Sequence, residues 1–100
     1  MDLRILMAFV EVADTCSISA AAVSLGYSQP AVSRQLAALE RLVGDQLYYR
    51  VHGGVALTSA GQELLPVVRE ILMLAGTISA ISSQGGDVDV MAASLCARVA

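Results

Sequence analysis

The stretch "YSQPAVSRQLAALE", from Tyr27 to Glu40, decides the fold. It contains residues that start a helix, and its apolar and polar side chains would lie on opposite sides of that helix. Ser28 is a favourable N-cap, and Pro30 lies in the first turn, where a missing backbone N–H costs nothing. At about 100° per residue, large apolar side chains gather on one side of such a helix: Val32, Leu36, Leu39 and Val43. The opposite side carries small and polar residues, namely Gln29, Pro30, Ser33, Arg34, Ala37 and Arg41. The stretch therefore predicts a helix over 28–43 whose polar side begins at the N-terminus, where partial positive charge favours anions.

Two helices are predicted before this stretch. Apolar residues recur at helical spacing over 3–14, and the Ala-rich segment "ISAAAVSL" indicates a short helix over about 19–25. The segment "DTCS" separates the two helices and offers N-cap residues, while Gly26 ends the second in a conformation that glycine tolerates. Only Gly26 and Tyr27 then remain before the next helix, which is the tight connection of a helix-turn-helix.

A β-hairpin is predicted after the polar helix. Gly44 ends that helix, and the aromatic segment "QLYYR" over 46–50 indicates a strand. The turn "VHGG" and the segment "VALT" over 55–58 complete the hairpin. Three helices followed by a two-stranded wing form a winged helix-turn-helix, so we expect a mainly α domain over residues 1–58. On the residues alone, a short helical pair with a hairpin could equally be a generic interaction module.

A long helix is predicted over 59–83, capped by Thr58 or Ser59. We expect Pro66 to kink it or remove one hydrogen bond, and Gly76 to weaken it by about 1 kcal/mol. Its apolar residues follow alternating steps of four and three, as in a coiled coil: Ala60, Leu64, Val67, Ile71, Leu74, Ile78 and Ile81. Packing within one chain is the alternative, but a chain of this size offers little surface to cover such a helix. We therefore expect a homodimer through residues 59–83 of a linker and dimerisation segment, 59–84.

The last residues, 85–100, follow a linker-like "SSQGG". We expect them to be a hinge and the beginning of a truncated further domain, or a disordered tail.

Composition limits the classes of function. Apolar residues make up 56% of the chain, charged residues 15%, and the net charge is −3. The negative charge counts against nucleic-acid binding, so any DNA contact must depend on a few well-placed arginines. A single His, two distant Cys and scattered acids give no catalytic or metal cluster, so we expect no enzyme. Neither a signal peptide nor a membrane span is evident, which favours a cytoplasmic protein.

The motifs "SISAAAVSLGYSQPAVSRQLAALERLVGDQLYYR" and "LTSAG", in this order, resemble the N-terminal DNA-binding domain of LysR-type transcriptional regulators over about residues 3–83. The resemblance implies that the helix over 28–43 enters the major groove of double-stranded DNA. The DNA-contacting residues implied in this chain are Ser28, Gln29, Pro30, Ser33, Arg34, Arg41, Arg50 and His52. Relatives carry a basic wing, whereas the segment "VHGGVAL" that follows Arg50 has only His52, and this departure from the family pattern predicts weaker phosphate binding. Without the resemblance, a merely solvated helix side would be an equal alternative.

The resemblance also implies that a dimer reads an inverted repeat, through the seam residues Leu64, Val67, Ile71, Leu74, Ile78 and Ile81. Full-length relatives continue into an effector-binding domain, so a small-molecule inducer would bind there and no cofactor is expected in this chain. RNA polymerase is a further partner implied for a full-length protein, and the nucleoid is the implied location. The alternative is a protein-interaction or dimerisation module that has lost DNA binding, which the charge of −1 over residues 1–58 (four Arg against five acids) favours.

Overall fold

The structure is a computed structural model that describes residues 2–84, and the surroundings of their side chains as far as residue 76. The expected hinge or tail over 85–100 therefore lies outside the described residues. The side chains of Ile78 and Ile81 do so as well, although their backbone belongs to the last helix.

Three helices form the first part of the chain: α1 (Leu3–Thr15), α2 (Ile18–Leu25) and α3 (Gln29–Val43). Each begins at a side chain that accepts a backbone N–H two or three residues later, and these caps are Asp2, Ser17 and Ser28. Each ends at a residue with left-handed backbone: Cys16, Gly26 and Gly44. The predicted helices are confirmed, with ends that differ by about one residue from the sequence expectation.

The wing consists of β1 (Tyr48–Val51) and β2 (Gly54–Leu57), which pair antiparallel from Tyr48↔Leu57 to Val51↔Gly54. The two-residue turn between them has positive φ at Gly53. The first strand starts two residues later than predicted, because Leu47 is held outside it. Its N–H donates to the Glu40 carboxylate at 2.8 Å, and its carbonyl accepts the Thr58 N–H at 3.0 Å.

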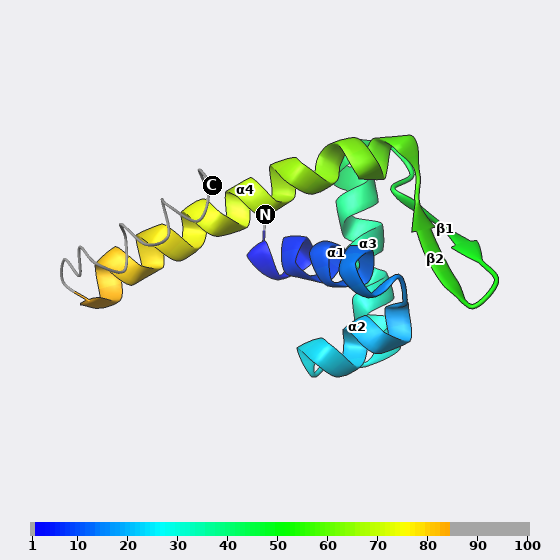
Figure 1. Ribbon diagram of the computed structural model, residues 1–100, viewed down its shortest axis with the longest axis horizontal. Coiled ribbons are helices and arrows are strands. Elements are labelled where there is room, and N and C mark those ends of the chain that lie inside the picture. Colours follow the sequence, from blue (N-terminus) through cyan, green and yellow to red (C-terminus); the bar gives the residue numbers. More distant parts are fainter. Residues whose placement is uncertain (1, 85–100) are drawn as a thin grey trace. The chain divides into compact units, whose positions relative to one another are not determined.

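The core lies among α1, α2 and α3, which all contact one another, and the wing contacts α1 through β2. Figure 1 shows these three helices crossing, with the hairpin beside them. The largest fully buried side chains are Phe9, Leu6, Leu36, Leu39, Leu47, Val12, Val32 and Val68. One expectation was wrong: Val43, predicted to be buried, is 43% exposed, because it is the last residue of α3 and extends beyond the packed helices.

The base of the wing is fastened to the corner between α1 and α2 through main-chain atoms. The carbonyl oxygen of Cys16 accepts the N–H of Val55 at 3.0 Å. The backbone of Gly54 passes so close that a Cβ there would collide with the same carbonyl oxygen. The hairpin is therefore positioned by backbone contacts at its base, and its tip is free of this constraint.

The last helix, α4 (Ser59–Gln84), begins at Thr58, whose hydroxyl accepts the Gly61 N–H at 3.1 Å. The helix continues through Pro66 and Gly76. Gly61 is required by packing, since a Cβ at this position would collide with the Leu47 carbonyl oxygen. The first compact unit of the chain ends at Val68 and the second begins at Arg69, so the start of α4 belongs to the winged unit.

Candidate nucleic-acid interface

The polar face of α3, defined as Gln29, Pro30, Ser33, Arg34 and Arg41, is open to solvent. All of these side chains are exposed except Ser33, which is half-buried. The opposite side of the same helix is buried, because Val32, Leu36 and Leu39 are at most 2% exposed. The division predicted from the sequence is thus confirmed at these positions. A helix held rigidly by one side presents five small, polar or cationic side chains on the other.

The N-terminus of α3 combines a cap with unused donors. The Ser28 hydroxyl oxygen accepts the Ala31 N–H at 3.2 Å, which leaves its own proton available for a further acceptor. The N–H of Gln29 precedes the intrahelical bonds, the first of which runs from Val32 to the Ser28 carbonyl. Ser28 can therefore cap the helix and donate to an anion at the same time.

Three arginines of the winged unit have no acidic partner among the residues that the structure describes: Arg34, Arg41 and Arg50. The remaining one, Arg4, lies 2.6 Å from the Asp2 carboxylate at the start of α1. Hydrogen bonds from the Arg4 side chain and backbone hold the pKa of Asp2 below its usual value, and Asp2 raises the pKa of Arg4.

The acids of residues 2–58 all have contacts within the chain. Glu11 accepts the Ser24 hydroxyl at 2.7 Å, and Glu40 accepts the Leu47 N–H at 2.8 Å. Asp45 accepts the Gln46 N–H at 2.8 Å, and Asp14 also has a partner. The Glu40 carboxylate, which lies at the edge of the polar face in sequence, is thus directed to the loop before β1. Although the net charge over residues 1–58 is −1, Arg34 and Arg41 on the polar face of α3 form no ion pair with a carboxylate of the described residues.

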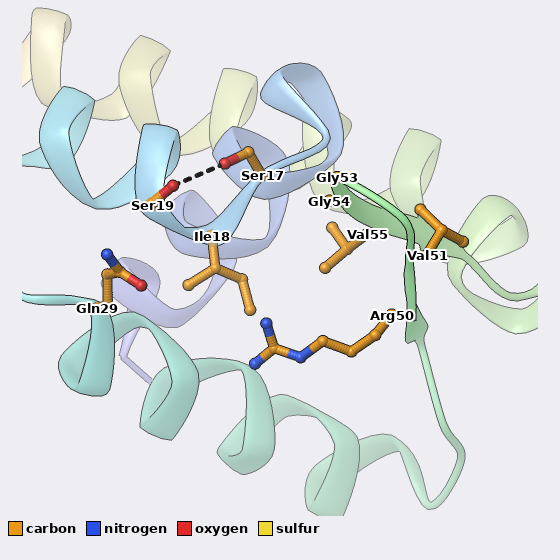
Figure 2. Close-up of a pocket in the computed structure, with 9 residues that line it drawn as sticks. All are labelled: Ser17, Ile18, Ser19, Gln29, Arg50, Val51, Gly53, Gly54 and Val55. Atoms are coloured by element: carbon orange, nitrogen blue, oxygen red, sulfur yellow. Dashed lines mark hydrogen bonds between the residues drawn. The ribbon is translucent and has the colours of Figure 1, made fainter.

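A hollow of about 260 Å³ lies between the start of α2, the start of α3 and the wing; we call it the α2–wing hollow. Its lining residues are Ser17, Ile18, Ser19, Gln29, Arg50, Val51, Gly53, Gly54 and Val55. Figure 2 shows the Arg50 guanidinium extending from the hairpin towards α3 and Ile18, with Gln29 at the far side and the Ser17–Ser19 pair above. The sequence interpretation singled out Gln29 and Arg50 but missed Ser17 and Ser19. The signal was present, since two hydroxyl residues flank the first position of α2.

His52 lies at the tip of the wing and is exposed. Two apolar side chains of β1, Tyr49 and Val51, are also exposed, at 47% and 43%. The wing therefore offers one cation, Arg50, and a mostly apolar surface.

The apolar seam of α4 is partly exposed in the single chain. Leu64 is half-buried, whereas Val67, Ile71 and Leu74 are 52%, 37% and 44% exposed. Val68, one position away, is 1% exposed and belongs to the core. Val68 lies four residues after Leu64 and three before Ile71, so it borders the predicted seam on the side that packs against the core.

Residues 3–62 match the bacterial regulatory helix-turn-helix proteins of the lysR family. The chain is a member of the LysR family. This confirms the resemblance noted in the sequence. Similar proteins include an HTH-type transcriptional regulator from the ibpB–leuC intergenic region of Azotobacter vinelandii, 45% identical over 88% of this chain and 62% of that protein. Another is the regulator TcbR of a Pseudomonas species, 45% identical over 76% of this chain and 26% of its own length. These relatives are named as regulators and not as enzymes, as the sequence predicted.

Solved structures of LysR-family proteins share the fold. A complex of the CbnR DNA-binding domain with DNA is 41% identical, with a TM-score of 0.79 over 86% of this chain and 99% of that one. A complex of the BenM DNA-binding domain with a benA site is 31% identical, with a TM-score of 0.76 over 84% of this chain and 98% of that one. The predicted winged helix-turn-helix fold is thereby confirmed.

The chain spans 62% of the length of one curated relative and 26% of another. Among the described residues, no helix combines the length and the hydrophobicity that crossing a membrane would need.

Proposed function

We propose that this LysR-family chain is the sequence-specific DNA-binding part of a transcriptional regulator and acts on double-stranded DNA as a homodimer. One observation carries the proposal. The polar face of α3 is a rigid, exposed surface with two arginines, Arg34 and Arg41, that no acid of the described residues neutralises. Solved structures of the similar CbnR and BenM DNA-binding domains are complexes with DNA, which supports the proposal.

Each residue of the polar face has a contact that suits its chemistry. The Gln29 amide can bond bidentately to adenine and Arg34 to guanine, while the Pro30 ring can touch a thymine methyl group. The hydroxyl groups of Ser28 and Ser33 can donate hydrogen bonds to phosphates. The guanidinium N–H groups of Arg41 and Arg50 can donate hydrogen bonds to phosphates as well. His52, at the exposed tip of the wing, could contact the DNA backbone.

The homodimer would form through the seam of α4. Exposed apolar side chains at Val67, Ile71 and Leu74 recur at steps of four and three, which is the pattern that a partner helix covers. Leu64, Ile78 and Ile81 extend this pattern along the sequence. A two-fold axis through such a dimer would make the recognised site an inverted repeat.

The experiment that tests DNA reading is enrichment sequencing of random duplex DNA bound by the purified protein at low salt. We expect a two-fold symmetric motif. Arg34→Ala should then abolish the specific complex while the dimer persists in analytical ultracentrifugation. If the folded dimer enriches no motif, the chain is a protein-interaction or dimerisation module that has lost DNA binding, and the proposal is wrong.

The experiment that tests the dimer is ultracentrifugation of Ile71→Glu beside Glu70→Gln, which changes a neighbouring charge outside the seam. Ile71→Glu should yield monomers, because a buried unpaired carboxylate in the seam is strongly unfavourable. A dimer that survives this change would place the interface elsewhere.

The wider setting follows from the same proposal. The protein would act in the cytoplasm at the nucleoid. A small-molecule inducer would bind an effector domain that these 100 residues do not include, and RNA polymerase would be a partner of the full-length protein.

A further inference from the structure

The last turn of α3 is joined to the first residues of α4 through the segment that precedes β1. We propose that Glu40, which holds this junction, determines the spacing of the two half-sites that the dimer reads. Glu40 is a positioning residue in this proposal, because it acts through the main chain of Leu47 and not by touching DNA. The inference rests on the proposed DNA-binding function and on the dimer through α4.

Glu40 binds the segment after α3 with both its main chain and its side chain. Its carbonyl oxygen accepts the N–H of Gly44 at 2.8 Å and that of Asp45 at 3.3 Å. Its carboxylate accepts the N–H of Leu47 at 2.8 Å, and Leu47 is only 1% exposed. One residue of α3 therefore attaches this segment to the helix at three successive points.

Thr58 attaches the same segment to α4. Its N–H donates to the Leu47 carbonyl at 3.0 Å, and its hydroxyl donates to the Gln46 carbonyl at 2.6 Å. The hydroxyl oxygen also caps α4 by accepting the Gly61 N–H at 3.1 Å. Leu47 thus connects two helices through its own main chain, because its N–H is bound by α3 and its carbonyl by the residue that begins α4.

The space between these two helices is not filled by side chains. A hollow of about 310 Å³ lies there, lined by Val43, Asp45, Ala60, Glu63, Leu64 and Val67. Val43 and Val67 are 43% and 52% exposed in the single chain. Val68 attaches the start of α4 to the core, and the hydrogen bonds through Leu47 supply the second point of attachment that a fixed angle between the helices requires.

The position of Glu40 in α3 is unfavourable for the helix itself. Glu40 lies in the last turn, where the partial negative charge of the helix C-terminus disfavours a carboxylate. A residue that opposes a local preference is expected where it serves a purpose elsewhere in the fold. The bond to the Leu47 N–H is such a purpose, because a charged acceptor makes a stronger hydrogen bond than a neutral one.

A small change of angle at this junction would become a change of half-site spacing. Gln29, at the start of α3, lies about 16 Å from Glu40 along the helix. A rotation of about 12° at the junction would move the start of α3 by roughly 3.4 Å, the rise of one base pair. One base pair also turns a half-site by about 35° around the DNA axis. A rigid junction should therefore reject a half-site displaced by one base pair, and a loosened junction should tolerate it.

The first test measures the preference for spacing. The selected inverted repeat is compared with duplexes that have one base pair added to, or removed from, its centre. If binding a changed spacing breaks the Glu40–Leu47 bond, wild type should favour the selected spacing by at least about tenfold, the usual contribution of a hydrogen bond to a charged group. Glu40→Ala should reduce this preference by about tenfold.

Two further variants serve as controls. Glu40→Gln should keep most of the preference, since its amide oxygen can still accept the Leu47 N–H. Both substitutions at this position remove the same charge, so a difference between them reports the hydrogen bond and not repulsion from DNA. Glu11→Ala removes a carboxylate that binds Ser24 away from the junction, and it should keep the wild-type ratio.

The second test loosens the junction from the side of α4. Thr58→Val keeps the shape of the side chain but loses the hydroxyl bond to Gln46, so it should relax the spacing in the same direction as Glu40→Ala. Thr58→Ser keeps the hydroxyl and should not. A merely structural role would lower the melting temperature without changing the ratio between duplexes, because unfolded protein binds none of them.

Three outcomes would overturn the inference. A spacing preference that survives in both Glu40→Ala and Thr58→Val would do so and leave the proposed function intact. Wild-type protein that binds single half-sites with no preferred spacing would remove any role for the junction, although the chain would still read DNA. The absence of any selected DNA site would refute the function and this role of Glu40 together.

Discussion

The salt dependence of DNA binding gives a numerical test of how few cations the interface contains. Of the unpaired arginines, Arg41 and Arg50 are assigned to phosphates and Arg34 to a base. A dimer would then make four arginine–phosphate contacts, and log K should fall against log salt with a slope of about −3.6. If Arg34 also contacts phosphate, the slope becomes about −5.4. Raising salt fourfold, from about 50 to about 200 mM, should therefore weaken binding by roughly 150-fold to 2,000-fold.

The perturbation is Arg41→Gln, which removes one proposed phosphate contact from each chain. Arg41 is exposed in the last turn of α3 and makes no hydrogen bond or ion pair among the described residues, so its loss should cost at most about 1 kcal/mol of stability, the usual contribution of a cation at a helix C-terminus. The slope should become shallower by about 1.8, because two counterion-releasing contacts are lost per dimer. Fluorescence anisotropy of a labelled duplex carrying the selected site, titrated at several salt concentrations, measures the slope directly.

Arg4→Gln is the matched control, because it removes the same charge from a side chain engaged with Asp2. Its slope should equal that of wild type. A slope in Arg41→Gln equal to wild type, or a wild-type slope steeper than about −7, would refute the assignment of cations made from the structure. The second result would mean that groups other than the unpaired arginines bring positive charge to DNA.

Further predictions concern stability and pH. Gly61→Ala should lower the free energy of unfolding by about 2–3 kcal/mol in urea titrations, because the new Cβ would meet the Leu47 carbonyl oxygen. Gly76→Ala, in the same helix but with open space around it, should instead raise helix stability by about 0.5–1 kcal/mol, and equal losses in both variants would contradict the packing. The lowered pKa of Asp2 means that its stabilising contact with Arg4 is present above the ordinary carboxyl pKa and is lost as pH falls through the folded-state value. The melting temperature of wild type should therefore exceed that of Asp2→Asn at pH 7 and converge with it in acid; a constant difference would argue against this linkage.

The helices could be predicted from the sequence because their signals are local. Ser17, Ser28 and Thr58 are caps that accept an N–H three residues later, and Gly26 and Gly44 end helices with left-handed backbone. The two sides of α3 followed from a periodicity that packing preserves.

The remainder depended on contacts between distant residues. The start of β1 could not be predicted, because Leu47 is tied to Glu40 and Thr58, which lie on other elements. The exposure of Val43 was missed because helical periodicity continues past the point where its packing partners end. Ser19 and Arg50 line the same hollow only because the hairpin is placed beside the start of α2. The two residues are 31 positions apart, and no sequence pattern links them.

The composition counts charges but does not show where they lie. A count of residues treats Glu40 and Arg41 as cancelling neighbours. In the structure, Glu40 accepts the Leu47 N–H, whereas Arg41 has no such partner among the described residues. Placement, and not net charge, therefore decides whether this surface can attract a polyanion.

The hydrogen bond from Val55 to the Cys16 carbonyl involves no side chain, and the close passage of Gly54 needs only the absence of one. The attachment of the wing is therefore insensitive to the side chain at His52, whereas Gly53 is needed for its positive φ. Mutations that place a cation at position 52 would change the affinity for DNA without disturbing the fold. A lineage could in this way adjust how long the protein stays on its operators, and how much salt it tolerates, through single substitutions that folding does not select against.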